Sequence, residues 1–411
     1  MNQTTTTSRM RSATIGAAVL TAAAMLTACS GQHGAYTSAA LKQSEQRLGA
    51  IKAGAEFETA RQQFLSGDLP KALKTIDTSV SLAPTVTKSQ VLRGRILLEM
   101  GEYEDALNAF ATAIELDPQH VEANFHRGVA FERISRWQDA LTHYEKSATL
   151  DPTEPRFIVA QAEMMLELRR REDSRMLLES ALDRFPNSAA VRHTLASVAL
   201  LDGSTILAAR LLREARLLAP EDTGILEDLA RAEMSNGRFA EAEEALRDLL
   251  AEDDMEARRD LMHMRVRCLI EMNRLVDARV ALLALTGDRK GEADRQAWLT
   301  LGRVSLKLND MPRLRTAASR LMALEPTKPD GRLLMAAWQR RRGDLEGSLR
   351  SINAAIELEP RQEESWVMRG VVLGELGKST EAAESLRVAQ GLRTTSPSPT
   401  FVNVPLEADD R

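Results

Sequence analysis

"LNAFATAIELDP", residues 107–118, ends in proline, and similar stretches recur along the chain at a constant interval. "LKTIDTSVSLAP" (73–84) precedes it by 34 residues, and "LTHYEKSATLDP" (141–152) follows it by 34 residues. The prolines that keep this interval form two runs: Pro84, Pro118, Pro152, Pro186 and Pro220, and then Pro326 and Pro360. Because 14 prolines scattered over 411 residues would not hold one interval by chance, the chain is built from a repeated unit.

Small residues occupy two further positions of the same frame. With each repeated proline counted as position 32, position 8 is Ala60, Gly94, Gly128, Ala162, Ala196, Ala230, Gly302, Ala336 and Gly370. Position 20 is Ala72, Ala106, Ala140, Ser174, Ala208, Ala242, Ser348 and Ala382. Small side chains let two helix backbones approach closely, and a larger one would overpack the contact at a cost of about 1 to 3 kcal/mol.

Between these two small positions, position 15 favours a tight turn. It is Gly67, Gly101, Gly203, Gly237, Gly343 and Gly377, with Asn309 in one unit. Glycine and asparagine tolerate the left-handed conformation that ends a helix. We therefore expect two helices in each unit, each of about 14 residues and some 21 Å long at 1.5 Å per residue.

The predicted second helices carry an apolar face that one unit cannot bury. In the second unit this face is Ala106, Leu107, Phe110, Ala113 and Ile114, at helical spacing. Neighbouring units must stack to cover such faces. With aromatic residues at 4% and glycine and proline placed as punctuation, the composition also favours an all-helical protein.

These residues resemble the tetratricopeptide repeat. Its W-x-x-L-G motif is present as Trp298, Leu301 and Gly302, with Pro326 closing that unit, and Trp366 with Gly370 repeats most of it. The resemblance covers about ten units between residues 53 and 391. It implies an all-α fold, a right-handed α-solenoid of about ten helix-turn-helix repeats, and it leaves the partners open.

The middle of the array departs from the pattern. Asp254 stands where proline is expected, and Ala278 follows Ala242 by 36 residues instead of 34. We therefore divide the array into units one to six (53–252), an atypical unit with a loop (253–294), and units eight to ten (295–391). Either one solenoid tolerates small insertions here, or two arrays flex against each other.

The N-terminus has the features of a targeting segment. Arg9 and Arg11 precede an uncharged, alanine-rich stretch, and Leu26-Thr27-Ala28-Cys29 resembles the bacterial lipobox. The resemblance implies a lipoprotein signal peptide over 1–28, cleavage before Cys29 and a lipid on its thiol. Residues 29–52 would then form the lipidated start and tether. The alternative is an ordinary secretory signal or an uncleaved anchor.

Residue 30 bears on the compartment, since an Asp after the lipidated Cys tends to retain Gram-negative lipoproteins in the inner membrane. Ser30 points, by that resemblance, to a lipid-anchored protein of the bacterial cell envelope, at the outer membrane and facing the periplasm. Cys268, the one other cysteine, falls in an apolar helical pattern and is expected to be buried and structural. The tail 392–411 is rich in Pro, Ser and Thr and predicts disorder.

Charge and motifs exclude several classes of function. The net charge is −5, and −7 once residues 1–28 are set aside, which disfavours a nucleic-acid partner. The six histidines form no H-E-x-x-H pair, and no phosphate-binding loop or G-x-S-x-G elbow occurs. The sequence therefore predicts no enzyme and neither a cofactor nor a metal.

The remaining candidate site is the face that the first helices present. In the family this face is lined by positions 2, 5, 9, 12 and 13 of each unit. Position 5 supplies Phe57, Val91, Phe125 and Val159, and position 9 supplies Arg61, Arg95, Arg231 and Arg303. An apolar row beside guanidinium groups fits an extended peptide or an amphipathic helix that carries carboxylates. The alternative is that position 5 packs between repeats and the arginines are solvated.

Two arginine runs, 169–171 and 340–342, fall at turns between paired helices. Cations at a helix C-terminus favour the helix dipole and need no partner. The leading interpretation of the whole chain is a membrane-anchored, non-enzymatic scaffold for envelope proteins, in assembly of an envelope, pilus or polysaccharide-export complex. The alternative is a regulatory or accessory subunit of an envelope enzyme such as a peptidoglycan hydrolase or protease.

Overall fold

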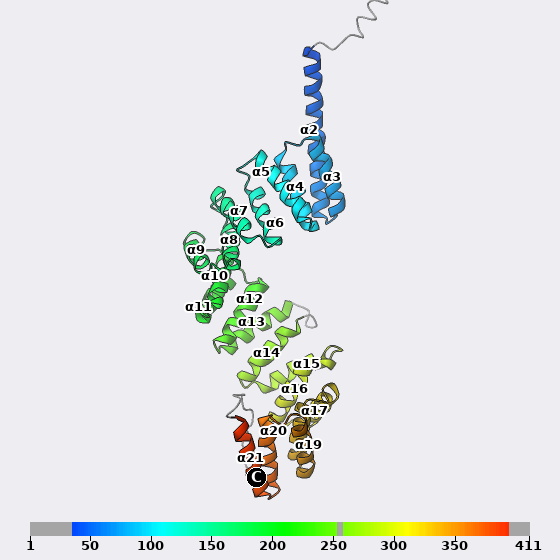
Figure 1. Ribbon diagram of the computed structural model, residues 1–411, viewed down its shortest axis with the longest axis vertical. Helices are drawn as coiled ribbons and strands as arrows, with labels where there is room; N and C mark the ends of the chain where they lie inside the picture. Colours follow the sequence, from blue (N-terminus) through cyan, green and yellow to red (C-terminus); the bar gives the residue numbers. More distant parts are fainter. Residues whose placement is uncertain (1–34, 253–257, 394–411) are drawn as a thin grey trace, which may run out of the picture. The chain divides into compact units, whose positions relative to one another are not determined.

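The computed structural model describes residues 35–252 and 258–393, and its regular structure is entirely helical (Figure 1). Within these two ranges there are twenty α-helices and one short 3-10 helix, and no β-strand. The helices form ten consecutive pairs that follow the 34-residue frame, so the predicted all-α repeat fold is confirmed. The signal segment, Cys29, residues 253–257 and the tail from residue 394 lie outside the described residues.

The helices divide into two compact units, and the boundary between the units falls at Leu177 and Leu178. The first unit contains α2 (Ala35–Leu65), α3 (Leu69–Leu82), α4 (Thr87–Met100), α5 (Tyr103–Leu116), α6 (Val121–Arg133), α7 (Trp137–Leu150), α8 (Pro155–Glu167) and the first half of α9 (Arg171–Arg184). From α2 to α8 each helix packs on the next, and the first helices of neighbouring repeats also touch, α2 on α4 and α4 on α6.

The second unit continues the same pattern. After the second half of α9 it contains α10 (Ala189–Leu201), α11 (Thr205–Leu218), α12 (Thr223–Ser235), α13 (Phe239–Glu252), α14 (Arg259–Glu271), α15 (Leu275–Thr286), η1 (Gly291–Ala293), α16 (Arg295–Lys307), α17 (Met311–Leu324), α18 (Asp330–Arg341), α19 (Leu345–Leu358), α20 (Glu363–Glu375) and α21 (Ser379–Arg393). From α10 on, each helix packs on the next, and the first helices α16 and α18 also touch.

A left-handed residue ends the first helix of every pair. The backbone φ at position 15 lies between 55° and 82° in Gly67, Gly101, Ser135, Arg169, Gly203, Gly237, Asn273, Asn309, Gly343 and Gly377. Glycine was expected there in six units. In three units the same turn forms on a serine, an arginine or an asparagine that the pattern did not reveal, namely Ser135, Arg169 and Asn273. The tertiary fold therefore imposes this turn even where the residue disfavours it.

The small positions are buried where the two helices of a pair meet. Ala106 and Ala140 have no exposed surface. A methyl group built on Gly128 would lie 2.6 Å from the ring of Tyr144 in the paired helix, and one on Gly302 would lie 2.4 Å from Leu334 in the first helix of the next repeat. Gly370 likewise faces Leu386 at 2.7 Å. Residues without a Cβ are therefore required at these contacts.

The prolines and tryptophans of the motif sit at the junctions between repeats. Pro118 and Pro152 follow directly after the residues that cap α5 and α7, and Pro326 lies two residues after the end of α17. The indole N–H of Trp366 donates to the carbonyl oxygen of Pro360 at 2.8 Å. Trp298 makes the equivalent bond at 2.9 Å, to Gly291 in the loop before its helix.

The loop that precedes α16 is fastened to the body of the second unit. The guanidinium group of Arg259 donates to the carboxylates of Asp288, at 3.1 Å, and Asp294, at 2.6 Å. It also donates to the carbonyl oxygen of Leu285 at 2.7 Å. The loop that ends the atypical unit predicted over 253–294 is thus held against α14 and α15.

Candidate functional site

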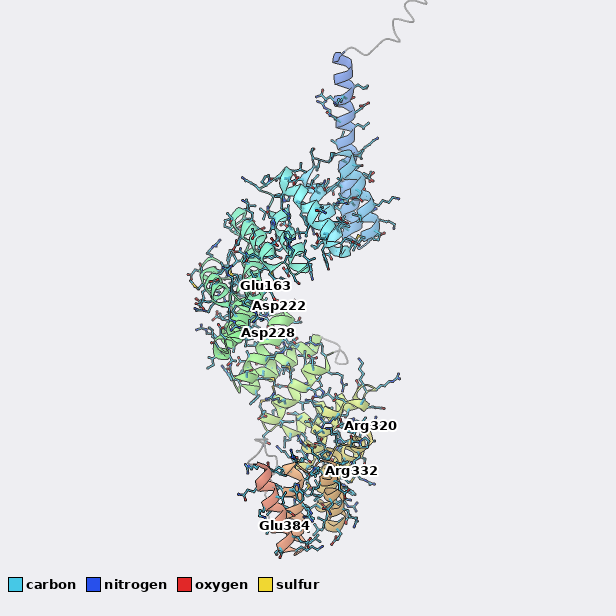
Figure 2. All side chains as sticks on the ribbon, in the orientation of Figure 1. Glu163, Asp222, Asp228, Arg320, Arg332 and Glu384 are labelled. Atoms are coloured by element: carbon cyan, nitrogen blue, oxygen red, sulfur yellow. The ribbon has the colours of Figure 1, made fainter. Side chains whose placement is uncertain are left out.

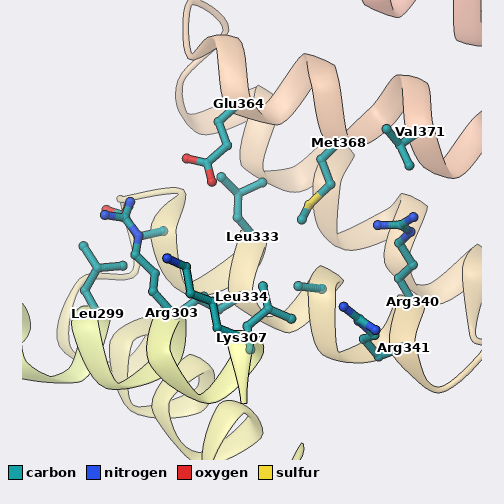
Figure 3. A pocket seen from close by; sticks show the side chains of 13 residues that line it. Leu299, Arg303, Lys307, Leu333, Leu334, Arg340, Arg341, Glu364, Met368 and Val371 are labelled. Carbon is teal, nitrogen blue, oxygen red and sulfur yellow. The ribbon is translucent and has the colours of Figure 1, made fainter. Parts of the chain in front are cut away.

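A cavity opens on the first helices of the last three repeats, and its lining comes entirely from α16, α18 and α20 (Figure 3). Most of the lining residues stand at positions 2, 5, 9, 12 and 13 of their repeats. The lining is Leu299, Arg303, Leu306, Lys307, Asp330, Leu333, Leu334, Ala337, Arg340, Arg341, Glu364, Met368 and Val371. The cavity therefore belongs to the face that the first helices present, within one compact unit.

The floor of the cavity is apolar. Leu333 and Leu334 of α18 are buried, and Met368 of α20 and Leu299 of α16 are half-buried beside them. The cavity volume is about 220 Å³. Pockets that enclose a whole drug-sized ligand measure roughly 300 to 1,000 Å³. This cavity therefore fits one or two large side chains of a longer molecule better than a complete cofactor.

Basic side chains surround the apolar floor. Figure 3 shows Arg303 and Glu364 at one end of the cavity and Arg340 and Arg341 at the other, with Leu333 and Met368 between them. Arg340 is held by Glu375, since its Nε lies 2.9 Å from both carboxylate oxygens. Four cations and two carboxylates line the cavity, so its net charge is positive.

Two of the four cations have no carboxylate partner. Among residues 35–252 and 258–393, no Asp or Glu forms an ion pair with Lys307 or Arg341, and both side chains are exposed at the cavity wall. Asp330, by contrast, is paired with Arg295 at 2.7 Å. Lys307 and Arg341 are therefore available to bind an incoming carboxylate, for which Arg has a bidentate geometry.

Glu364 is one of the two acidic residues that line this cavity. Burial raises the pKa of the Glu364 carboxyl above its usual range, and the positive charge of Arg303 opposes that rise. A carboxyl with a raised pKa takes up its proton at a higher pH than ordinary carboxyls do. The net charge of the cavity therefore becomes more positive as the pH falls.

Of the groove residues expected from the sequence, Arg303 alone lines this cavity. In the first unit Val91 is buried in the core, and the ring of Phe125 packs 5.3 Å from Phe157, between centroids. The guanidinium of Arg95 lies over the ring of Phe64 at 5.2 Å. These side chains are engaged within the fold.

Three further groove candidates lie elsewhere in the first unit. Phe57 packs on the core of the first repeat, and the amino group of Lys88 lies 4.6 Å above its ring. Arg61 forms an ion pair with Glu58 on the same helix at 2.8 Å. Val159 is half-buried on α8. None of these three residues lines the hollow that the first unit presents at α6 and α8.

The first unit has instead a shallow acidic hollow. It is lined by Glu132 of α6 and by Glu163 and Glu167 of α8, with Arg133 beside them; Glu163 is labelled in Figure 2. The hydroxyl of Tyr144 donates to Glu132 at 2.5 Å. Carboxylates at this density repel an acidic segment, which is the ligand expected for the groove. The basic site of the second unit fits that ligand better.

Arg231 belongs to an ionic network on the first helices of the middle repeats. It pairs with Glu227 and with Asp228, the latter at 3.5 Å. Asp228 also bonds the imidazole of His193 at 2.9 Å, and Arg258 reaches Glu227 at 2.5 Å. Because opposite charges are matched within the fold here, this surface offers little to an acidic partner.

The basic residues of the cavity were missed where the sequence was interpreted one repeat at a time. Arg340 and Arg341 belong to the run 340–342, which was explained by the helix dipole alone. Their positions, 12 and 13 of the repeat, were the available signal, and Lys307 stands at position 13 of the preceding unit. Only the contact of three neighbouring first helices brings these side chains together.

Within 35–252 and 258–393, no group of three or more His, Cys, Asp or Glu side chains is placed to hold a metal ion. In that part of the chain, no helix combines the length and the apolar composition needed to cross a bilayer. Cys268 is fully buried, and burial raises the pKa of its thiol to about 11.

Comparison with known proteins agrees with this architecture. Two tetratricopeptide-repeat family models match the chain, one over residues 91–155 and 338–397 and the other over residues 199–263. A search of curated proteins finds no match.

Solved structures of repeat proteins are similar to parts of the chain. A tetratricopeptide repeat protein from Parabacteroides merdae is 14% identical, covers 58% of this chain and 93% of its own, and has a TM-score of 0.45. PilF of Pseudomonas aeruginosa is 13% identical, with coverages of 48% and 90% and a TM-score of 0.43. MamA of Desulfovibrio magneticus is 18% identical, with coverages of 42% and 97% and a TM-score of 0.38.

The family matches span most of α4 and all of α5 to α7, then α11 to α13, and then α19 to α21, with small residues at the helix contacts that the motif requires. The 34-residue frame, the left-handed turn in every pair and these matches lead to one conclusion: the chain belongs to the tetratricopeptide repeat family.

Proposed function

We propose that this protein is a lipid-anchored, non-enzymatic scaffold of the bacterial cell envelope that holds a partner protein in the cavity of its last three repeats. Tetratricopeptide repeats imply a protein–protein interaction scaffold. The observation that carries the finer proposal is the apolar floor of Leu333 and Met368 set between Lys307 and Arg341, two cations that pair with no carboxylate among the described residues.

The chemistry of the cavity defines the partner segment. It has one or two large apolar side chains that displace water from the floor, and carboxylates nearby that reach Lys307 and Arg341. Each fully buried apolar side chain contributes about 1.5 to 3 kcal/mol before the cost of ordering the segment is counted. The affinity of the isolated segment is therefore modest, and its salt dependence is strong.

The anchor is supported by the sequence. The motif Leu26-Thr27-Ala28-Cys29 has the lipobox pattern, and α2 begins six residues after Cys29, at Ala35. A lipid at Cys29 would hold the repeats close to the membrane, where they meet envelope proteins. Two acyl chains are enough for stable anchoring.

The cavity is tested by charge reversal with a matched control. We would select a random peptide library against the wild-type protein and against the double variant Lys307→Glu/Arg341→Glu. The control, Lys378→Glu/Arg387→Glu, changes the net charge equally with exposed residues of the same unit that lie outside the cavity lining. We expect peptides with acidic and large apolar residues to bind wild type and control, and to lose affinity for the cavity variant. Equal binding to all three proteins would refute the cavity proposal.

The anchor is tested separately in cells. The substitution Cys29→Ser should leave the precursor uncut by signal peptidase II and unlabelled by a fatty-acid analogue. Acylation of that variant, or a wild-type protein without lipid, would refute the anchor and leave the cavity proposal standing.

A further inference from the structure

The first helix, α2, extends well beyond the helices that pack against it. It has 31 residues, from Ala35 to Leu65, and its second half packs in the first repeat, where Ala53 and Ala60 are buried. The hydroxyl of Ser79 donates to the carbonyl oxygen of Ala53 at 2.8 Å. The side chains of residues 40–48 are all exposed, and Figure 1 shows this half of α2 running on beyond α3.

An uncharged stripe follows this exposed half at intervals of three and four residues. The stripe is Leu41, Ser44, Leu48, Ile51 and Ala55. Leu41 is 52% exposed, Leu48 is 54% exposed and Ile51 is 70% exposed. These are the alternating a and d positions of a heptad, the spacing that one helix presents to another in a coiled coil.

The polar member of the stripe is compatible with an apolar contact. The hydroxyl of Ser44 donates to the carbonyl oxygen of Leu41 in its own helix at 2.7 Å. Its hydrogen bond is therefore already made, and covering it with a neighbour leaves no donor without a partner. Charged residues stand beside the stripe and not within it.

The stripe faces away from the repeats. At 3.6 residues per turn, Leu48 and the buried Ala53 are separated by about 140° around the helix. The contact of α2 with α3 extends to Gly49, where an added methyl group would lie 3.6 Å from the carbonyl oxygen of Leu82. No described helix therefore covers the stripe. A free helix of fewer than about 12 to 15 residues is only marginally stable in water, so this exposed half of α2 lacks the packing that usually stabilises a short helix.

We propose that the stripe binds the same stripe of a second copy of the chain, as a short, parallel, two-stranded coiled coil. The inference rests on the anchor at Cys29 that is proposed above. The six residues from Cys29 to Ala35 span at most about 20 Å, so both helices would start near one membrane surface and run in one direction. Confinement to that surface raises the effective concentration of the second copy.

Flanking charges make this contact weak and adjustable. In the parallel register, Arg47 at position g faces Lys52 at position e of the second copy. Two such pairs of like charges oppose association, so dimers form on the membrane and not in dilute solution. The substitution Arg47→Glu turns both pairs into attractions and should tighten the dimer about fivefold.

Cysteine cross-linking of the full chain in membranes tests the register. Ser44→Cys places a thiol at a d position, where two copies bring their Cβ atoms within disulfide reach. Gln46→Cys, two residues away at position f, points outward and is the matched control. Under a mild oxidant we expect a dimer several-fold more abundant for Ser44→Cys, and more abundant again with Arg47→Glu. The native Cys268 is buried and does not interfere.

Three outcomes would overturn the dimer. The first is equal cross-linking of Ser44→Cys and Gln46→Cys, and the second is no cross-linking of either. The third is weaker cross-linking of Ser44→Cys when Arg47→Glu is added, a result that an antiparallel or unrelated contact would give. Fatty-acid labelling of the same samples separates the two proposals. If the protein carries the fatty-acid label but Ser44→Cys gives no dimer, the dimer alone is refuted. If the protein carries no label, the anchor is refuted, and cross-linking is then measured at high protein concentration in solution.

Discussion

A methyl group added to Gly94 in α4 would lie 2.5 Å from the ring of Phe110 in α5, closer than packed atoms approach. The same relationship joins Gly128 and Tyr144 one repeat later, at 2.6 Å. Where position 8 is alanine, position 24 is aliphatic, as in the buried pair Ala230 and Leu246. The ring and the missing Cβ therefore compensate each other within a repeat.

This compensation predicts a coupled pair of substitutions. Gly94→Ala should lower the free energy of unfolding by about 1 to 3 kcal/mol, because the methyl group displaces the Phe110 ring. Adding Phe110→Leu, which recreates the alanine and leucine combination, should recover part of that loss. The measurement is urea denaturation of the two single variants and the double variant, read as a double-mutant cycle.

The control for this cycle is Gly54 in α2, where an added methyl group meets nothing within 4 Å. Gly54→Ala should raise the unfolding free energy by about 0.5 to 1 kcal/mol, since alanine favours the helix. Equal effects of the two glycine substitutions would contradict the packing account.

The left-handed turns predict stabilising substitutions. Arg169 and Ser135 each have a φ of 59°, a conformation that costs a residue with a side chain about 1 to 2 kcal/mol. Glycine removes that cost and loses about 0.5 to 1 kcal/mol to entropy, so Arg169→Gly and Ser135→Gly should each give a small net gain. Gly101→Ala, at a φ of 82°, should be destabilising. Thermal denaturation of the three variants tests the pattern, and a loss of stability in the two glycine variants would contradict it.

The imidazole of His143 predicts a pH dependence of stability. Burial lowers the pKa of His143 to about 4, with a contribution from the charge of Arg127. The unfolded chain binds this proton near pH 6.5 and the folded chain does not, so stability is complete above about 6.5 and falls between about 6.5 and about 4. His143→Gln should remove this part of the loss.

The comparison is made by urea denaturation at about pH 7.5 and about pH 5, where most carboxylates remain charged. His143 Nδ1 lies 3.4 Å from the amide oxygen of Asn124, and a glutamine amide can serve the same neighbour. An unchanged pH slope in His143→Gln would show that this imidazole does not titrate as described.

Glu364 predicts how pH affects binding in the cavity. Because burial raises the pKa of its carboxyl, lowering the pH neutralises Glu364 before ordinary glutamates. Binding of an acidic peptide selected against the wild-type protein should therefore strengthen, relative to Glu364→Gln, as the pH is lowered from neutral toward the usual range of a glutamate carboxyl. Fluorescence anisotropy with one peptide and both proteins measures the difference. Parallel pH profiles would contradict the role of Glu364.

Much of the fold follows from short-range sequence features. The repeated prolines, the glycines at position 15 and the small residues at positions 8 and 20 each express a local requirement: a helix end, a left-handed turn or a close helix contact. Such requirements are visible in the sequence because only a few residue types meet them. The turns at Ser135 and Arg169 were not visible, since there the packing of two helices overrides the preference of the residue.

The sequence by itself determined the paired helices, their order and the family, because a periodic pattern of small and apolar residues specifies how each helix meets the next. The family resemblance indicated which positions line the face that the first helices present. Only the tertiary structure decided which of those side chains remain available. Arg61 and Arg231 pair with carboxylates of their own helices, and Arg95 lies over the ring of Phe64, while Lys307 and Arg341 flank an apolar floor. That floor is built by residues about 30 positions apart in the sequence, whose contacts exist only after the repeats have stacked.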